Sequence, residues 1–328
     1  MRPVPRMVMP LLIGTIVFVL CLRYILLNFQ WDKILQVLSR VHLAWWLVVS
    51  LSIPLYWILR TLRWFVLLRN VQVRVSLLEL YFCTSVSLSL ANITPLQSGE
   101  MLKVELLKQR GRLDRSSGYG SFLIERVLDF VMLVTLAVTS VLSGVNIGLE
   151  IDRTRMFYGL LVLVFLILAG WLVVSKIRIS GKIGEFLSCV KTSAGDIKTL
   201  LLISLLTFLS WAIVAIGWHF CLYSISIDLS FRQSIALMSI VTFVNILSFV
   251  PGAIGVSEVS TVELLKSWQQ DVVSAQAGAV LLRSYAIMIL LIGAIHFLSW
   301  KVWQKGHDRT SGSKARGIDP QKSKSPEC

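Results

Sequence analysis

Charged residues are scarce in this sequence. Only 15% of the 328 residues are charged, compared with about 25% in an average soluble protein, whereas 55% are hydrophobic. The mean hydropathy is +0.75. Several separate runs of about 20 apolar residues follow one another, and a single soluble core could not bury all of them. The composition excludes a water-soluble globular protein, a disordered chain and a secreted disulfide-bonded domain. It predicts a polytopic membrane protein.

Residues that bind metals or form disulfide bonds are also few. The five cysteines form no Cys-x-x-Cys pair, and the four histidines show no metal-ligand spacing. Gly-x-Ser-x-Gly, phosphate-loop and His-Glu-x-x-His motifs are absent from the sequence. We therefore expect no cofactor and no bound metal, and the chain has few candidates for covalent catalysis.

Basic residues exceed acidic ones and give a net charge of +14. They lie mostly between the apolar runs and in the C-terminal tail, where they orient a membrane protein and meet anionic lipid headgroups. No nucleic-acid-binding module is visible, so we expect no nucleic-acid partner. We predict one transmembrane domain over residues 1–303, followed by a disordered, basic and cytoplasmic tail over residues 304–328.

Eight apolar runs are long enough to cross the bilayer as helices, because a helical residue rises about 1.5 Å and the hydrocarbon layer is about 30 Å thick. The runs are continuously apolar rather than alternating, so the predicted fold class is an all-α, polytopic membrane helix bundle. The runs lie near residues 8–28, 43–67, 77–96, 121–143, 156–175, 199–223, 231–250 and 276–299.

Two polar loops repeat the same series of residues. Each has a proline, a glycine four residues later, the pentapeptide VELLK, and then an arginine in the next apolar run. The matching residues are Pro95 and Pro251, Gly99 and Gly255, the pentapeptides at 104–108 and 262–266, and Arg126 and Arg283. The series predicts an internal repeat near residues 77–143 and 231–299, an arrangement that is common in transporters.

The repeated loops share one local chemistry. Proline ends the preceding helix, glycine permits a sharp bend, and about three turns of amphipathic helix follow. The predicted hinge residues are Pro95, Gly99, Pro251, Gly252 and Gly255. Each segment is short for a full crossing and fits a re-entrant or broken helix that lines protein or water. The alternative is an ordinary helix that lies flat on the bilayer.

The basic loops bear on the topology. With eight simple crossings and a cytoplasmic N-terminus, the lysine-rich loop 176–198 would face outward, against the rule that basic loops stay inside. If each polar segment adds a net crossing, the loops 69–74, 108–115 and 176–198 and both termini are cytoplasmic, and the repeats are inverted. We favour this arrangement, in the cell (inner) membrane.

Ionisable residues inside the apolar runs are the clearest functional signal, because each costs at least about 2.5–3.5 kcal/mol at the bilayer centre. Guanidinium groups bind phosphate through paired hydrogen bonds. The candidate headgroup-binding residues are Arg60, Arg63, Arg126 and Arg283, and the candidate charge partners in a cavity are Glu100, Lys103, Glu125, Asp129 and Glu258. The alternative role of these charges is structural, as salt bridges that hold helices together.

These motifs together resemble those of a known family. They are Arg60-x-x-Arg63-Trp64, Pro95-x-x-x-Gly99-Glu100-x-x-Lys103, Glu125-Arg126-x-x-Asp129 and Pro251-Gly252-x-x-Gly255-x-x-Glu258. The series resembles the transmembrane region of lysylphosphatidylglycerol synthases, whose stand-alone members are also called flippase-like domain proteins. The resemblance covers roughly residues 8–300. It implies a bundle of about eight helices with re-entrant segments that moves a polar lipid between leaflets.

The chain departs from the family pattern in two places. Ala253 stands where a second glycine is common in the family. The soluble aminoacyl-transferase domain of full-length synthases is not part of this sequence, so we do not expect lipid lysylation.

The leading hypothesis is a transporter, rather than an enzyme, that moves an anionic or glycosylated lipid headgroup across the bilayer. Its partner would be a membrane phospholipid or glycolipid. One alternative is a membrane-embedded enzyme or accessory subunit of lipid or polyprenyl-linked precursor biosynthesis, with Glu125 or Asp129 as a general base or metal ligand and with lipid-biosynthesis enzymes as partners. Another is a scaffold for the membrane helices of a partner, with purely structural charges.

Overall fold

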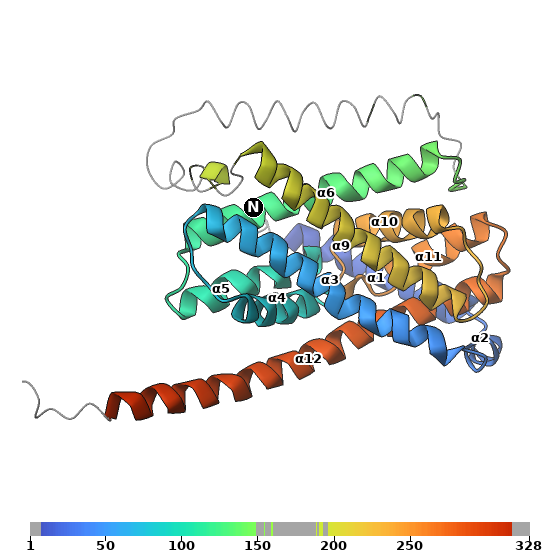
Figure 1. The fold of residues 1–328 in the computed structure, drawn as a ribbon. Helices are drawn as coiled ribbons and strands as arrows, with labels where there is room; N and C mark the ends of the chain where they lie inside the picture. Colours follow the sequence, from blue (N-terminus) through green and yellow to red (C-terminus); the bar gives the residue numbers. More distant parts are fainter. Residues whose placement is uncertain are drawn as a thin grey trace, which may run out of the picture.

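The computed structural model of the chain describes residues 8–148 and 196–316 and, between them, residues 154, 159, 188 and 190–192. All regular secondary structure in these ranges is helical (Figure 1). The predicted all-α class is therefore confirmed. The predicted span 156–175 and most of the loop 176–198 lie outside the described residues.

Two short 3₁₀ helices, η1 and η2, interrupt the series of α-helices. A helix occupies most or all of each of the other seven predicted spans. In chain order the elements are α1 (Val8–Asn28), α2 (Trp31–Leu38), α3 (Leu43–Asn70), α4 (Leu77–Ala91), η1 (Pro95–Met101), α5 (Leu102–Gln109), α6 (Arg115–Leu142), α9 (Ile197–Tyr223), α10 (Phe231–Leu247), η2 (Pro251–Ala253), α11 (Val256–Ser267) and α12 (Val272–Arg316).

Three of the described helices are long and apolar enough to cross a membrane alone: Leu43–Asn70, Ile197–Tyr223 and Val272–Val302. The segments Gly14–Asn28 and Trp31–Leu38 make a fourth span if the pair, bent by 82°, is counted as one. Helix α6 is as long as α3, at 28 residues, but three charged residues interrupt its apolar sequence. By length and composition, the described part of the chain therefore has fewer simple crossings than the seven predicted there.

Helices α4 and α5 are the two arms of a hairpin, which we call the first hairpin (residues 77–109). Arg110, directly after α5, donates to the Glu79 carboxylate near the start of α4 at 2.7 Å. The start of α4 and the end of α5 therefore lie at the same end of the bundle. The bend between them is η1. Helix α4 has 15 residues, about 22 Å in length at 1.5 Å per residue, which is less than the hydrocarbon thickness.

Helices α10 and α11 form an equivalent second hairpin (residues 231–267), with its bend at η2. Arg232, near the start of α10, donates to the Ser143 carbonyl at 3.2 Å. Trp268, directly after α11, donates to the carbonyl of Asn146. Both ends of the second hairpin thus lie beside the loop that follows α6.

The two hairpins enter the bundle from opposite ends. Helix α6 starts beside the first hairpin and finishes beside the second, whereas α12 follows the second hairpin and returns to the first. There the Arg110 guanidinium lies 4.7 Å from the centre of the Trp300 ring. Accordingly, α6 runs from left to right in Figure 1 and α12 from right to left. The internal repeat predicted from the sequence is present and is inverted: α4–η1–α5–α6 corresponds to α10–η2–α11–α12.

The structure places the ends of the first hairpin as the favoured arrangement expects, with loops 69–74 and 108–115 at one end of the bundle. Each polar segment turns its chain back to the end it came from, because the proline and left-handed residues at its tip reverse the direction. A returning hairpin leaves the order of ends unchanged. The loop residues Val71, Val73, Val75 and Leu113 therefore still share one apolar cluster with Trp300, at the basic end of the bundle.

Helix α12 continues beyond the membrane-spanning length to Arg316. The first part of the basic tail, residues 304–316, is thus helical, whereas the composition predicted disorder from residue 304. Adding a residue to an existing helix requires no new nucleation. Residues 317–328 lie outside the described part of the chain.

Candidate functional site

The tips of the two hairpins share an unusual backbone. The two residues after the first proline, Leu96 and Gln97, have φ of 54° and 55°. The two residues after the second, Gly252 and Ala253, have φ of 62° and 48°. The left-handed region costs a non-glycine residue about 1–2 kcal/mol, and such strained backbone concentrates at functional sites. The strain recurs at equivalent positions, which makes the pair of tips the first candidate for a site.

The two tips meet in the middle of the bundle, where η1 and η2 contact each other. Tight packing explains the glycine near each tip. A Cβ atom at Gly99 would lie 2.7 Å from the backbone of Leu90 on α4. Gly255 has a φ of 86°, and a Cβ atom there would lie 2.5 Å from the Cβ of Cys21 on α1. A larger side chain at either position would force the hairpin tip away from its neighbour.

Each hairpin also carries a glutamate that pairs with an arginine on the next helix. Glu100 accepts from Arg126 Nη2 at 2.5 Å, and Glu258 accepts from Arg283 Nε at 2.5 Å. Both glutamates lie four residues before the VELLK pentapeptide. The two ion pairs are therefore related by the repeat, and each ties a hairpin tip to the helix that follows it.

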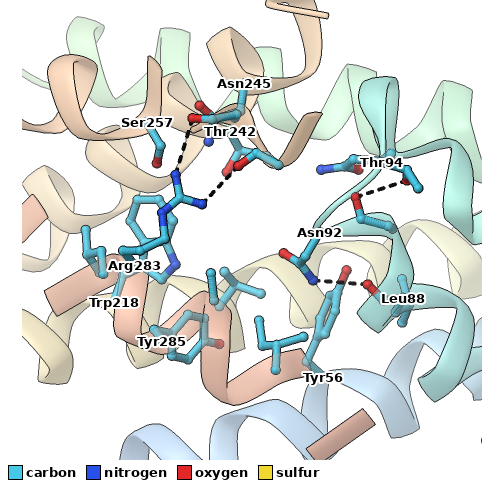
Figure 2. A pocket seen from close by; sticks show the side chains of 18 of the residues that line it. Tyr56, Leu88, Asn92, Thr94, Trp218, Thr242, Asn245, Ser257, Arg283 and Tyr285 are labelled. Carbon is cyan, nitrogen blue, oxygen red and sulfur yellow. Dashed lines mark hydrogen bonds between the residues drawn. The ribbon is translucent and has the colours of Figure 1, made fainter. Parts of the chain in front are cut away.

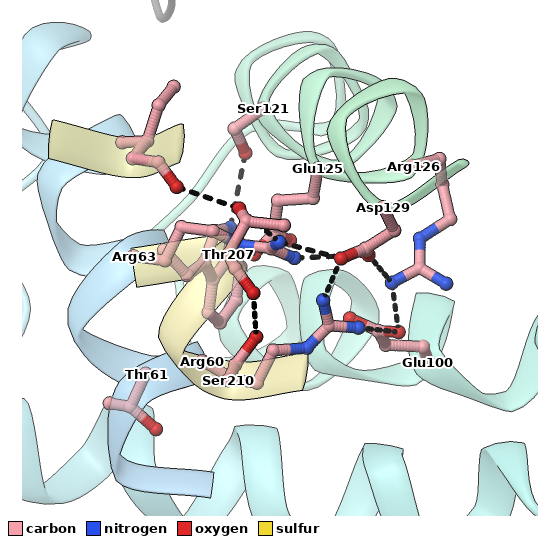
Figure 3. A network of polar contacts seen from close by, with 12 residues as sticks. Arg60, Thr61, Arg63, Glu100, Ser121, Glu125, Arg126, Asp129, Thr207 and Ser210 are labelled. Carbon is pink, nitrogen blue, oxygen red and sulfur yellow. Dashed lines mark hydrogen bonds and ion pairs between the residues drawn. The ribbon is translucent and has the colours of Figure 1, made fainter. Parts of the chain in front are cut away.

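The first hairpin belongs to a much larger network of seven charged side chains, six of which are labelled in Figure 3. It joins α3, η1, α5 and α6. The members are the cations Arg60, Arg63, Lys103 and Arg126 and the carboxylates Glu100, Glu125 and Asp129. Within the described residues, the network thus has one positive charge in excess.

Asp129 is the centre of this network. Its carboxylate accepts from Arg60, from Arg63 at 2.8 and 3.2 Å, and from Arg126 at 2.7 Å. The indole of Trp211 on α9 adds a fourth donor at 3.3 Å. Removing one member of a buried ion pair typically costs about 3–5 kcal/mol, because the partner charge stays buried without compensation. Asp129 therefore holds α3, α6 and α9 in one arrangement.

Glu125 and Lys103 complete the network on the side of the first hairpin. Glu125 accepts from Arg63 Nε at 3.2 Å and from Lys103, and Lys103 also donates to Glu100 at 2.9 Å. The Lys103 ammonium lies 4.8 Å from the Trp64 ring centre, which adds a cation–π contact. Glu125 and Asp129 thus use their oxygens on cations, and this favours a structural role for them over that of a base or metal ligand.

The four arginines that the sequence marked for headgroup binding fall into two kinds. Arg60 and Arg63 are buried, with side chains at most 2% exposed, and both are held by carboxylates. Arg126 and Arg283 have side chains that are 24% and 25% exposed. Headgroup binding by any of them stays a prediction, but only the second kind has side-chain surface that a ligand could reach.

Arg283 is held differently from Arg126. Besides Glu258, it donates to the backbone carbonyls of Gly252 at 2.9 Å and Ala253 at 3.3 Å. Glu258 in turn accepts from the Gly255 amide at 2.7 Å and caps α11. One arginine therefore fixes the whole tip of the second hairpin.

A cavity of about 150 Å³ lies between the two tips (Figure 2). Both hairpins line it, together with α3, α9 and α12. Its polar and aromatic lining residues are Tyr56, Asn92, Thr94, Gln97, Trp211, Trp218, Thr242, Asn245, Ser257, Arg283 and Tyr285. The Gln97 side chain accepts from Arg126 at 3.4 Å, which places Arg126 directly behind the wall of the cavity.

Most of these lining residues were not singled out in the sequence. The aromatic residues lie on three different helices and have no common spacing, so only the packing brings them together. A weak signal did exist in Asn92 and Asn245, two amides that shortly precede the prolines of the two tips. In the described ranges, no group of three or more His, Cys, Asp or Glu side chains is placed to hold a metal ion.

The inverted pair of hairpins around a shared cavity defines a polytopic α-helical membrane protein with an internal repeat. The family model described as the lysylphosphatidylglycerol synthase TM region matches residues 11–295, and the chain belongs to this family. A UPF0104 membrane protein of Methanocaldococcus jannaschii is 27% identical over 218 residues, which are 63% of this chain and 92% of that protein. The family membership inferred from the short motifs is confirmed.

Proposed function

We propose that the protein moves the polar headgroup of a lipid across the bilayer through the space between the two hairpin tips. The observation that carries this proposal is the cavity itself, which is lined by both halves of an inverted repeat. In transporters built from inverted repeats, the substrate site lies at the repeat interface near the middle of the membrane. The acyl chains of a lipid can stay in the hydrocarbon layer, so only the headgroup needs a polar path.

The charged residues have different roles in this proposal. Arg283 in the cavity wall and Arg126 directly behind it attract the headgroup, while Glu100, Asp129 and Glu258 neutralise the arginines when the site is empty. Arg60 and Arg63 hold the frame of helices around the cavity.

We further propose that the protein works in the cell membrane, with the end that carries loops 69–74 and 108–115 in the cytoplasm. Basic loops are retained on the cytoplasmic side. The C-terminal part of α12 lies at the same end, where Trp300 contacts Arg110. The C-terminus would then also be cytoplasmic.

A reconstitution experiment tests the proposal. The full chain is placed in vesicles that contain acyl-labelled phosphatidylglycerol, phosphatidylethanolamine or phosphatidylcholine, and leaflet exchange is followed by adding a quencher outside. We expect faster exchange than in protein-free vesicles for at least one lipid. The variant Arg283→Gln with Glu258→Gln, which removes both charges of the pair, should lower that rate by about tenfold, the effect of losing one charge-assisted hydrogen-bonded group.

Lys301→Gln is the matched control, because Lys301 is an exposed cation on α12 that lies over the Phe297 ring, away from the cavity. It should leave the rate unchanged. Equal exchange in protein-free vesicles and in vesicles with the wild-type chain, for all three lipids, would contradict the proposed function.

A further inference from the structure

The cavity has an uneven distribution of charge. Among the described residues that line it, Arg283 is the one charged side chain, and carboxylates are missing from that lining. The seven-charge network behind the cavity carries an excess of one positive charge, and its member Arg126 contacts the lining residue Gln97. Because Glu258 neutralises Arg283, the net charge around the cavity is the single positive charge of the network, which favours an anion over a cationic headgroup.

Aromatic rings can bind cations, but two of the four rings in the cavity already face one. The Arg60 guanidinium lies 5.5 Å from the centre of the Tyr56 ring and 5.9 Å from that of Trp211. A second cation at these rings would lie close to the guanidinium and be repelled by it. This arrangement argues against a choline-like ligand.

Besides Gln97, whose side-chain oxygen accepts from Arg126, two side-chain amides line the cavity, one from each half of the repeat. Asn245 Oδ1 is buried and has no hydrogen-bond partner among the described residues. Asn92 donates its Nδ2 to the Leu88 carbonyl at 3.0 Å, so its oxygen is turned the other way (Figure 2). Both amides can therefore accept hydrogen bonds, and a ligand that satisfies them must carry donors such as hydroxyl groups.

Arg283 supplies the means of binding a phosphate. Its two terminal nitrogens donate to the carbonyls of Gly252 and Ala253, which are neutral acceptors. A phosphate oxygen is a stronger acceptor, and two of them match the guanidinium fork. A phosphate in the cavity would thus compete for these nitrogens while Nε stays on Glu258.

We propose that the cavity binds the headgroup of an anionic phospholipid that carries hydroxyl groups, with the phosphodiester at Arg283 and the hydroxyls at Asn92 and Asn245. That the ligand is a lipid rests on the proposed function, whereas the preference for a hydroxylated phosphodiester rests on the cavity. Binding of the phosphate frees the Gly252 and Ala253 carbonyls, so the ligand itself loosens the tip of the second hairpin.

The test measures lipid retention by the full chain in detergent, by native mass spectrometry, with three probes that have the same acyl chains. Phosphatidylglycerol has a phosphodiester and hydroxyls, phosphatidylmethanol has the same charge without hydroxyls, and phosphatidylcholine is zwitterionic. We expect retention in that order, with about a tenfold difference between the first and the last. Glycerol 3-phosphate in excess should displace phosphatidylglycerol if the cavity binds the headgroup.

Three variants locate the effect. Arg283→Gln with Glu258→Gln should abolish the preference for both anionic lipids, and Lys301→Gln should preserve it. Asn245→Leu should weaken the preference for phosphatidylglycerol over phosphatidylmethanol, because only Asn92 is then left to accept from the hydroxyls, and should keep the preference over phosphatidylcholine. Arg283→Lys retains the charge without the fork, and an intermediate preference is expected, which gives a readout even where the double variant does not fold.

The proposal is overturned if phosphatidylcholine is retained as well as phosphatidylglycerol, or if Lys301→Gln lowers the preference as much as the changes at Arg283 do. These outcomes are separable from failure of the proposed function. A chain that shows this Arg283-dependent binding but moves no lipid refutes transport and keeps the site. A chain that moves phosphatidylcholine as fast as phosphatidylglycerol refutes the selectivity and keeps transport.

Discussion

The first hairpin ends in a network of seven charges, whereas the second is held by a single ion pair and two backbone carbonyls. Their backbones nevertheless bend in the same way, at the same distance after a proline, and each pairs its glutamate with the next helix. The difference shows that the repeat determines the path of the chain but not how firmly the tip is held. We interpret the first hairpin as a fixed wall of the cavity and the second as the part that a ligand can release.

Removing the centre of the network should have the largest effect. Asp129→Ala leaves three arginines without their shared carboxylate, and we expect a loss of at least about 3–5 kcal/mol of stability. Little folded protein should remain, as measured by size-exclusion chromatography and thermal melting in detergent. Glu258→Ala is the counterpart in the second hairpin and should cost less, because Arg283 keeps its two carbonyl acceptors. An equal loss in both variants would contradict the comparison.

The tips should also differ in local opening. The second tip has fewer bonds to the rest of the bundle, so its backbone amides should exchange with deuterium about tenfold faster than those of the first tip. Hydrogen-exchange mass spectrometry on the chain in lipid nanodiscs compares peptides that contain residues 95–101 and 251–256. Slower exchange at the second tip would reverse the assignment of the fixed and the releasable hairpin.

A glycine at position 253 should relax the second tip. Ala253 has a φ of 48°, where glycine is strain-free, so Ala253→Gly should stabilise the protein by about 0.5–1 kcal/mol. Ala279→Gly, within the first turns of α12, should have the opposite sign and a similar size. The stability changes of both variants are measured as shifts in melting temperature in the same detergent.

The smallest expected effect is the loss of a helix N-cap, and it should be equal in the two repeats. Asp114 accepts from the Ser117 amide at the start of α6, and Asp271 accepts from the Val273 and Ser274 amides at the start of α12. Replacing either by Ala should cost about 1 kcal/mol, measured by melting temperature. Unequal losses would show that the repeats differ in their caps as well as in their charges.

These two N-caps should also make the stability of the protein depend on pH. Hydrogen bonds from the Ser274 side chain and from backbone amides lower the pKa of Asp271. For Asp114, burial alone would raise the pKa, but the Ser117 donors outweigh burial and lower it. Because both pKa values are depressed, the stabilisation is complete at neutral pH and is lost as the pH falls from about 4 through the folded-state pKa. The melting temperature of both Ala variants should lose this part of its acid dependence.

Much of the site could be predicted from the sequence, but its internal division could not. Charges at helical spacing placed Arg60 with Arg63, and Glu125 with Asp129, on shared faces. The partner of each charge, however, lies up to 69 positions away, as for Arg60 and Asp129. No local pattern decides which of four arginines is enclosed by carboxylates and which borders a cavity.

The sequence by itself determined the membrane class, the all-α fold and the repeat, because hydrophobic length, proline and glycine act through nearby residues. Only the tertiary structure decided that the polar segments turn back, that their tips meet, and that Arg283 lines a cavity while Arg60 and Arg63 are enclosed. Those outcomes depend on how remote helices pack, since a buried charge takes whichever partner the packing brings within reach.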